Sequence, residues 1–173
     1  MYMIILSTLA HIVDVNLKLD RRTVNNMSTP FDRVANGLKY LVVHHTASEA
    51  PLLESWNPYG YDYPEYDYGV DLDGTFRVGR PLTVKGAHCL PDNYPYNEIS
   101  MNQKSIGFVL AGSFDKRKAL DNQINQAAYN IGRICKKYGL PISRESIIPH
   151  FKASATFCPG KNTIDRIYKK LGI

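Results

Sequence analysis

Residues 39–46 read KYLVVHHT, and this short stretch decides which fold the chain is expected to adopt. Its β-branched and apolar residues are typical of a strand buried inside a sheet. Two histidines, His44 and His45, stand at the end of the stretch. Because successive side chains of a strand point to opposite faces, only one of the two can readily face a shared site.

Further strands are predicted on the C-terminal side of this one. Residues 66–72 and 75–79 flank Asp73-Gly74, a pair that is typical of a tight hairpin turn. Residues 105–111 (SIGFVLA) predict another buried strand, and residues 147–149 predict a short strand or turn that leads into His150.

Two helices are predicted between and after these strands. Apolar residues recur at helical spacing from Leu120 to Tyr138, with Asp121 as the expected N-cap and Gly139 as the stop. A last helix is expected from about Thr163 to Leu171. Strands interspersed with helices predict an α/β fold, in which a central mixed sheet is flanked by helices.

Length and composition fit one globular domain. The chain has 173 residues, of which 44% are hydrophobic and 21% charged, and these values exclude disordered and fibrous classes. No apolar run approaches the roughly 20 residues that cross a bilayer, so we expect no membrane insertion. The N-terminus is apolar but lacks a basic start, so we expect no signal peptide.

Residues 1–36 are predicted to form an N-terminal extension, and residues 37–173 the catalytic domain. The net charge of +5 favours anionic partners such as acidic cell-wall polymers. Since the basic residues are scattered along the chain, we interpret them as a solvated surface and expect no nucleic-acid site.

Histidine and cysteine side chains near the C-terminus suggest a metal site. His150 and Cys158 stand eight residues apart in HFKASATFCPG (150–160). A catalytic zinc ion needs three protein ligands and one open position, and imidazole and thiolate suit it. This spacing is weak evidence alone, because a hydrogen-bonded buried histidine and an inert cysteine are the more common explanation of such residues.

The order of several motifs adds a resemblance to a known family. Residues 38–173 resemble the zinc N-acetylmuramoyl-L-alanine amidases of the peptidoglycan recognition protein type, which include phage lysozyme-type amidases. The matching motifs, in order, are VVHHTAS (42–48), YDYGVDLDGTFRVGR (66–80), GAH (86–88), SIGFVLAG (105–112) and HFKASATFCPG (150–160).

This resemblance implies the residues of a zinc site in a surface cleft. It makes His44, His150 and Cys158 the ligands of one zinc ion. It makes Tyr66 the active-site tyrosine, which would assist the attacking water or the tetrahedral intermediate. Thr156 stands where phage lysozyme-type amidases have a lysine and many recognition-protein amidases have a threonine.

Two positions depart from parts of the family. Thr156 brings no charge, so its contribution to catalysis is expected to be smaller than that of lysine, and Lys152 is the alternative donor. Some related amidases carry a glutamate in the strand that reads SIGFVLAG here, whereas Val109 and Ala111 offer no carboxylate.

Further residues are predicted to bind substrate. His88 in the GAH motif is expected to line the cleft, and Trp56 and Tyr63 belong to an aromatic loop that suits glycan or peptide surfaces. The alternatives are a structural histidine near the site and a loop whose aromatic residues form its own small core.

The expected function is hydrolysis of the amide bond between N-acetylmuramic acid and L-alanine of the peptidoglycan stem peptide. Together with the expected lack of a signal peptide, this fits a phage endolysin or a virion-associated lysin that is delivered to the cell wall, which is the interpretation we adopt. It also fits a cytoplasmic recycling amidase or an effector that a dedicated machine exports. The alternatives are a non-catalytic peptidoglycan-binding module and a structural virion module, docked to a larger particle through residues 1–36.

Overall fold

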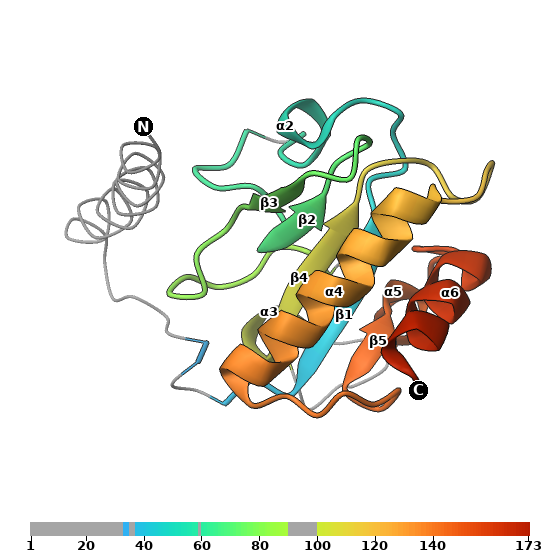
Figure 1. The fold of residues 1–173 in the computed structure, drawn as a ribbon. Coiled ribbons are helices and arrows are strands. Elements are labelled where there is room, and N and C mark those ends of the chain that lie inside the picture. The colour runs from blue at the N-terminus through green and yellow to red at the C-terminus, as the bar shows by residue number, and fades with distance from the viewer. Residues whose placement is uncertain (1–32, 35–36, 59, 90–99) are drawn as a thin grey trace, which may run out of the picture. The chain divides into compact units, whose positions relative to one another are not determined.

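The chain folds around a five-stranded sheet with the strand order β3-β2-β4-β1-β5 (Figure 1). The computed structural model describes residues 33–34, 37–58, 60–89 and 100–173. The strands are β1 (Tyr40–His45), β2 (Tyr68–Val70), β3 (Phe76–Val78), β4 (Ser105–Leu110) and β5 (Ile147–Pro149). Since β1 is parallel to β4 and β5, and β2 is antiparallel to β3, the sheet is mixed, as predicted.

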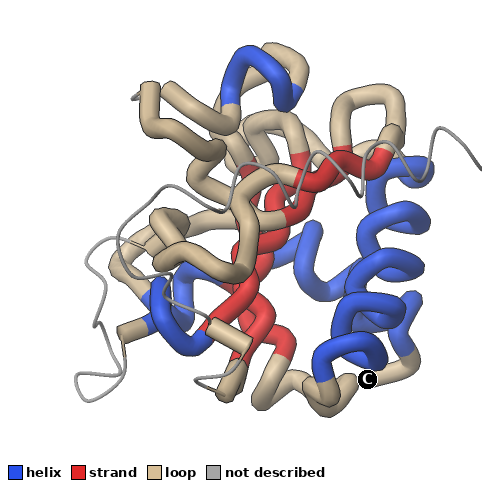
Figure 2. The backbone as a smooth tube through the Cα atoms, turned by 90° about the vertical axis from the view of Figure 1, so that its left-hand side faces the viewer, coloured by secondary structure: helices blue, strands red, loops and turns tan. Residues whose placement is uncertain are grey.

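In the part of the chain that the structure describes, two long helices and three short ones accompany the sheet. They are α2 (Leu52–Ser55), α3 (Met101–Lys104), α4 (Asp121–Tyr138), α5 (His150–Ala153) and α6 (Lys161–Leu171). In Figure 2 the two long helices, α4 and α6, lie along one side of the strands. Within the described residues, no helix is long and apolar enough to cross a membrane.

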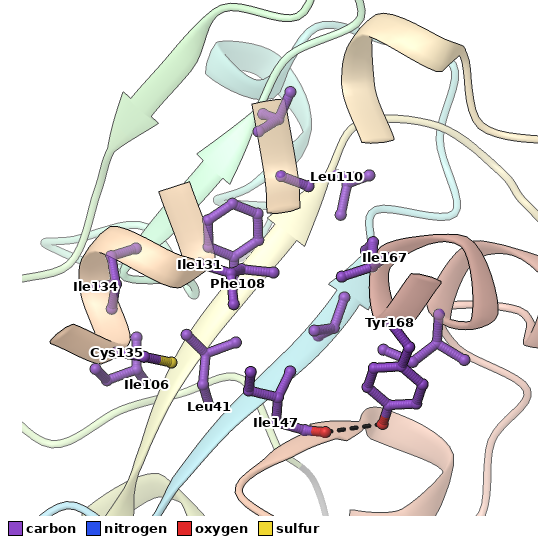
Figure 3. Packing of buried hydrophobic residues seen from close by; sticks show 14 of the residues in the cluster. Leu41, Ile106, Phe108, Leu110, Ile131, Ile134, Cys135, Ile147, Ile167 and Tyr168 are labelled. Atoms are coloured by element: carbon purple, nitrogen blue, oxygen red, sulfur yellow. Dashed lines mark hydrogen bonds between the residues drawn. The ribbon is translucent and has the colours of Figure 1, made fainter. Parts of the chain in front are cut away.

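Alternation along β1 divides its side chains between two cores. Leu41 packs with Phe108 of β4, Ile131 of α4 and Ile167 of α6 in the larger core (Figure 3). Val42 belongs to a smaller core on the opposite face. His44 therefore points to the face of Val42, away from the two long helices.

The N-terminal ends of the two long helices differ from those predicted, whereas their C-terminal ends, at Tyr138 and Leu171, agree. Asp121 is the first residue of α4 rather than its N-cap, and it pairs with Arg166 of α6. The N-cap is Leu120, whose backbone N–H donates to Oε1 of Gln123 at 3.2 Å. Helix α6 begins two residues earlier than predicted, because Gly160 ends the preceding loop at a φ of 85°.

A buried ion pair connects three segments beside the sheet. The Arg33 guanidinium donates to both carboxylate oxygens of Asp67, and its Nη1 also donates to the carbonyl of Ser105 at 3.0 Å. Asp67 accepts a further bond, from the backbone N–H of Gly107 at 2.7 Å. Both charged side chains are 0% exposed, so each charge is stabilised by the other and not by water. Arg33, from the predicted extension, therefore contributes to the folded core.

Replacing Arg33 with methionine is expected to lower the free energy of unfolding by about 3–5 kcal/mol, because the Asp67 carboxyl would stay buried without its partner. Urea unfolding measures this loss. Lys161→Met is the matched control, since it removes an exposed ion pair with Asp165 that contributes about 0.5 kcal/mol at most. Equally small losses in both variants would contradict the role given to Arg33.

Candidate metal centre

Parallel strand pairing brings two histidines to the same edge of the sheet. Val43 of β1 is in register with Pro149 of β5, and the residues that follow them in the chain are His44 and His150. Helix α5 begins at His150 and leads into the loop that holds Cys158. The backbone N–H of Phe151 donates to the carbonyl of Cys158 at 2.9 Å, which folds this loop back toward β1.

The ligand atoms of His44, His150 and Cys158 all lie within 4.8 Å of one another. The Cys158 Sγ is 4.0 Å from His44 Nδ1, and the ring centroids of His44 and His150 are 4.3 Å apart. The backbone N–H of His45 donates to the same sulfur at 3.2 Å. The structure thus brings together the three residues that the family resemblance implied.

One buried atom of this group supports a bound cation. His150 Nε2 is shielded from solvent and has no hydrogen-bond partner among the described residues. A buried polar atom without a partner is costly, and coordination of a metal ion would remove that cost. Two imidazoles and a thiol are suitable ligands for zinc, so the residues fit the metal that the resemblance implied.

Burial determines the protonation states of these side chains. It lowers the pKa of His44 well below its ordinary value and that of His150 to about 4, so both rings are neutral near pH 7 and can act as ligands. Burial also raises the pKa of the Cys158 thiol to about 12. Its thiolate therefore needs a cation beside it, and metal binding would release the thiol proton.

A second group of close ligand atoms shares His44 with the first. His44, His88 and Cys89 also lie within 4.8 Å of one another, and all three are buried. Here, however, both ring nitrogens of His88 face polar protein atoms, namely His44 Nε2 at 3.0 Å and Ser105 Oγ at 3.3 Å. The orphaned nitrogen of His150 therefore favours the first group as the metal centre.

Tyr66 and Thr156 lie at the partly exposed side of this centre. The Tyr66 ring centroid is 5.1 Å from that of His44, and the Tyr66 carbonyl accepts a bond from the N–H of Arg80 at 2.9 Å. Thr156 Oγ1 accepts from the backbone N–H of Cys158 at 3.2 Å. Both side chains are half-buried.

The structure places the other predicted residues at different depths. Trp56 is 6% exposed and packs with Leu52 in a small core, which favours the loop-core alternative over substrate contact. His88 is 4% exposed and lies against His44, so it matches the structural alternative. Tyr63 is half-buried and Lys152 is exposed.

The structure also defines the surroundings of His45 and of the two positions, Val109 and Ala111, where some related amidases carry a glutamate. His45 Nδ1 accepts from the backbone N–H of Phe114 at 3.0 Å, on the face opposite to His44, as alternation predicted. Val109 and Ala111 are fully buried beside Trp56. The sequence reasoning did not identify Asp67 or Ser105, although Asp67 lies inside the YDYGVDLDGTFRVGR motif.

Comparison with known proteins agrees with this geometry. The model of the N-acetylmuramoyl-L-alanine amidase family matches residues 34–161. Peptidoglycan-recognition protein SC2 of Drosophila melanogaster is 26% identical over 147 residues, which cover 78% of this chain and 74% of that protein. The chain belongs to the N-acetylmuramoyl-L-alanine amidase family.

Solved structures show the same fold. The endolysin N-acetylmuramoyl-L-alanine amidase LysCS from Clostridium intestinale aligns with a TM-score of 0.65 at 22% identity, covering 87% of this chain and 93% of that chain. A second match comes from the complex of tracheal cytotoxin with the ectodomains of peptidoglycan recognition proteins LCa and LCx. It has a TM-score of 0.59 at 25% identity and covers 76% of this chain and 81% of that chain.

The metal-free protein is expected to lose stability as the pH falls from about 6.5 toward 4. Unfolded histidines bind a proton near pH 6.5, whereas burial lowers the pKa of folded His150 to about 4, so acid favours the unfolded state. His150 alone corresponds to about 2 kcal/mol by pH 5. Urea unfolding across this range measures the loss, and an unchanged stability would contradict the burial of neutral histidines.

Proposed function

We propose that this protein is a zinc-dependent amidase that cleaves the bond between N-acetylmuramic acid and L-alanine of the peptidoglycan stem peptide. The observation that carries the proposal is the convergence of His44, His150 and Cys158, with the buried His150 Nε2 left without a partner. Membership of the amidase family supports the choice of substrate.

The three ligands would hold one zinc ion, and a set of three protein ligands leaves a fourth position for water or substrate. When bound there, zinc would supply Lewis-acid chemistry, activating a water molecule near neutral pH and polarising the scissile carbonyl. Burial of His44 and Cys158 excludes competing solvent from the inner side of the centre, so substrate and water would approach past His150 and Tyr66.

Tyr66 and Thr156 are the residues that would stabilise the transition state. The Tyr66 phenol donates one hydrogen bond, and its place beside the His44 ring suits the oxygen on which charge develops when the carbonyl is attacked. The Thr156 backbone is tied to Ser154 and its hydroxyl accepts from Cys158 N–H, which holds the hydroxyl near the sulfur ligand. Thr156 then donates its O–H to the same oxygen, more weakly than a charged lysine.

The proton transfers rely on few groups. Val109 and Ala111 carry no carboxylate, so the phenol of Tyr66 is the residue proposed to orient the attacking water. Lys152 is exposed on α5 and is the alternative to Thr156 as a donor to the developing oxyanion. Tyr63, half-buried in the loop before Tyr66, is proposed to contact the substrate.

We also propose that the protein acts as a phage endolysin or a virion-associated lysin. The family membership fits either role, and the fold is shared with an endolysin amidase. In this proposal the protein reaches the cell wall by release or by delivery with a particle, and residues 1–36 provide a docking segment.

Digestion of defined muropeptides, followed by mass spectrometry, tests the reaction. The zinc-loaded protein is expected to release the intact stem peptide from N-acetylmuramic acid, and Cys158→Ser is expected to lose both zinc and cleavage. Cys135→Ser is the matched control, because Cys135 is a buried thiol in α4 and belongs to the core. Zinc binding without any release of stem peptide would favour the non-catalytic binding module instead.

Tyr66→Phe separates metal binding from catalysis. This variant keeps the ring and should bind zinc normally, while turnover should fall about 10²–10³-fold, because one donor to the developing oxyanion is lost. Steady-state turnover and zinc content are measured on the same sample. Turnover equal to that of the unmodified protein would remove Tyr66 from the mechanism.

A further inference from the structure

His88 occupies a space that the sheet keeps open for it. A Cβ atom at Gly107 of β4 would lie 2.6 Å from Cγ of the His88 ring, which is closer than real side-chain contacts allow. The His88 ring also stands edge-on to the His44 ring, with the centroids 5.0 Å apart and the planes at 81°. Any larger residue at position 107 would therefore push His88 away from His44.

A chain of hydrogen bonds fixes which nitrogen of each ring carries a proton. The carbonyl of Met101 can only accept, so the Ser105 hydroxyl donates to it. The Ser105 oxygen then accepts from His88 Nε2, 3.3 Å away. A neutral His88 with its proton on Nε2 has a lone pair on Nδ1, which accepts from His44 Nε2 at 3.0 Å.

This series of hydrogen bonds also determines which nitrogen of His44 can bind a metal ion. When Nε2 of a neutral His44 donates to His88, Nδ1 of His44 carries no proton and offers a lone pair. Nδ1 is the nitrogen that faces Cys158, with the sulfur 4.0 Å away.

We propose that His88 is a positioning residue that holds His44 in the orientation and tautomer that a metal ion needs. The inference rests on the proposed zinc site but concerns a residue that does not touch the metal. The residues that hold His88 are themselves fixed by the buried ion pair. Arg33 donates to the carbonyl of Ser105, and its partner Asp67 accepts from the N–H of Gly107. The buried ion pair therefore supports the two residues of β4 that hold His88.

Cys89 offers an alternative role for His88, in which His88 is itself a metal ligand. Its Sγ lies 3.3 Å from His88 Nδ1, and His44, His88 and Cys89 would form a second set of ligands. A nitrogen that accepts a hydrogen bond from His44 cannot bind a metal ion through the same lone pair. Because only the ligand role uses Cys89, zinc binding by a Cys89→Ala variant distinguishes a positioning role for His88 from a ligand role.

Zinc affinity of the full chain, measured by competition with a chromogenic chelator, tests the proposal. His88→Ala is expected to weaken zinc binding about 10–100-fold, as loss of a partner to a ligand histidine does in other metal sites. His88→Asn places an amide oxygen near the position of Nδ1, so it should restore most of the affinity. Cys89→Ala is the control and should bind one zinc ion as tightly as the unmodified protein.

Two results of this titration would overturn the proposal. The first is a folded His88→Ala variant that binds zinc with unchanged affinity. The second is two zinc ions in the unmodified protein and one in Cys89→Ala, which would make His88 a ligand.

Nuclear magnetic resonance of isotope-labelled histidines in the metal-free protein provides a readout that needs neither zinc nor substrate. The proton of His44 is expected on Nε2, and a proton on Nδ1 would overturn the proposal even if His88→Ala does not fold. Failure of the proposed function looks different, because it would leave the tautomer and zinc affinity as expected while muropeptides stay uncut.

Discussion

Parallel pairing of β1 with β5 is the constraint on which the candidate site depends. It places Val43 opposite Pro149, so the residues that follow, His44 within β1 and His150 just after β5, lie side by side. Without this register the two rings would not approach to 4.3 Å between their centroids. The same pairing leaves room for the loop after α5 to return Cys158 to β1, where His45 N–H binds its sulfur.

This arrangement removes several ionisable groups from water, and their neighbours explain how the fold accommodates them. His45 has a backbone donor from Phe114, and His88 has Ser105 and His44. His150 Nε2 and the Cys158 thiol are not satisfied in the same way, because one is an orphaned atom and the other has a pKa raised to about 12. A metal ion that binds both would resolve the two costs together.

Much of this could be predicted from the sequence, because the signals were local. The stretch KYLVVHHT predicted β1 and the alternation of His44 and His45, and Gly139 predicted the end of α4, where its φ is 69°. The resemblance of the ordered motifs then selected His44, His150 and Cys158, whose spacing alone was weak evidence.

The remaining features depend on contacts between distant segments, and no local pattern encodes them. Arg33 and Asp67 are 34 residues apart, and only the folded chain reveals them as a buried pair. The same holds for His88, whose role depends on the space above Gly107. The sequence left open whether Trp56 contacts substrate or belongs to a small core of its loop, and in the structure it fills the space beside Gly79, where a Cβ would lie 3.0 Å from its ring.

X-ray absorption at the zinc edge of the loaded protein tests the central claim most directly, because it identifies the ligand atoms around the metal. With His44, His150 and Cys158 as ligands, we expect two nitrogen neighbours at about 2.0–2.1 Å and one sulfur at about 2.3 Å, together with one further light atom. A spectrum without sulfur, or with two sulfur neighbours, would contradict this ligand set.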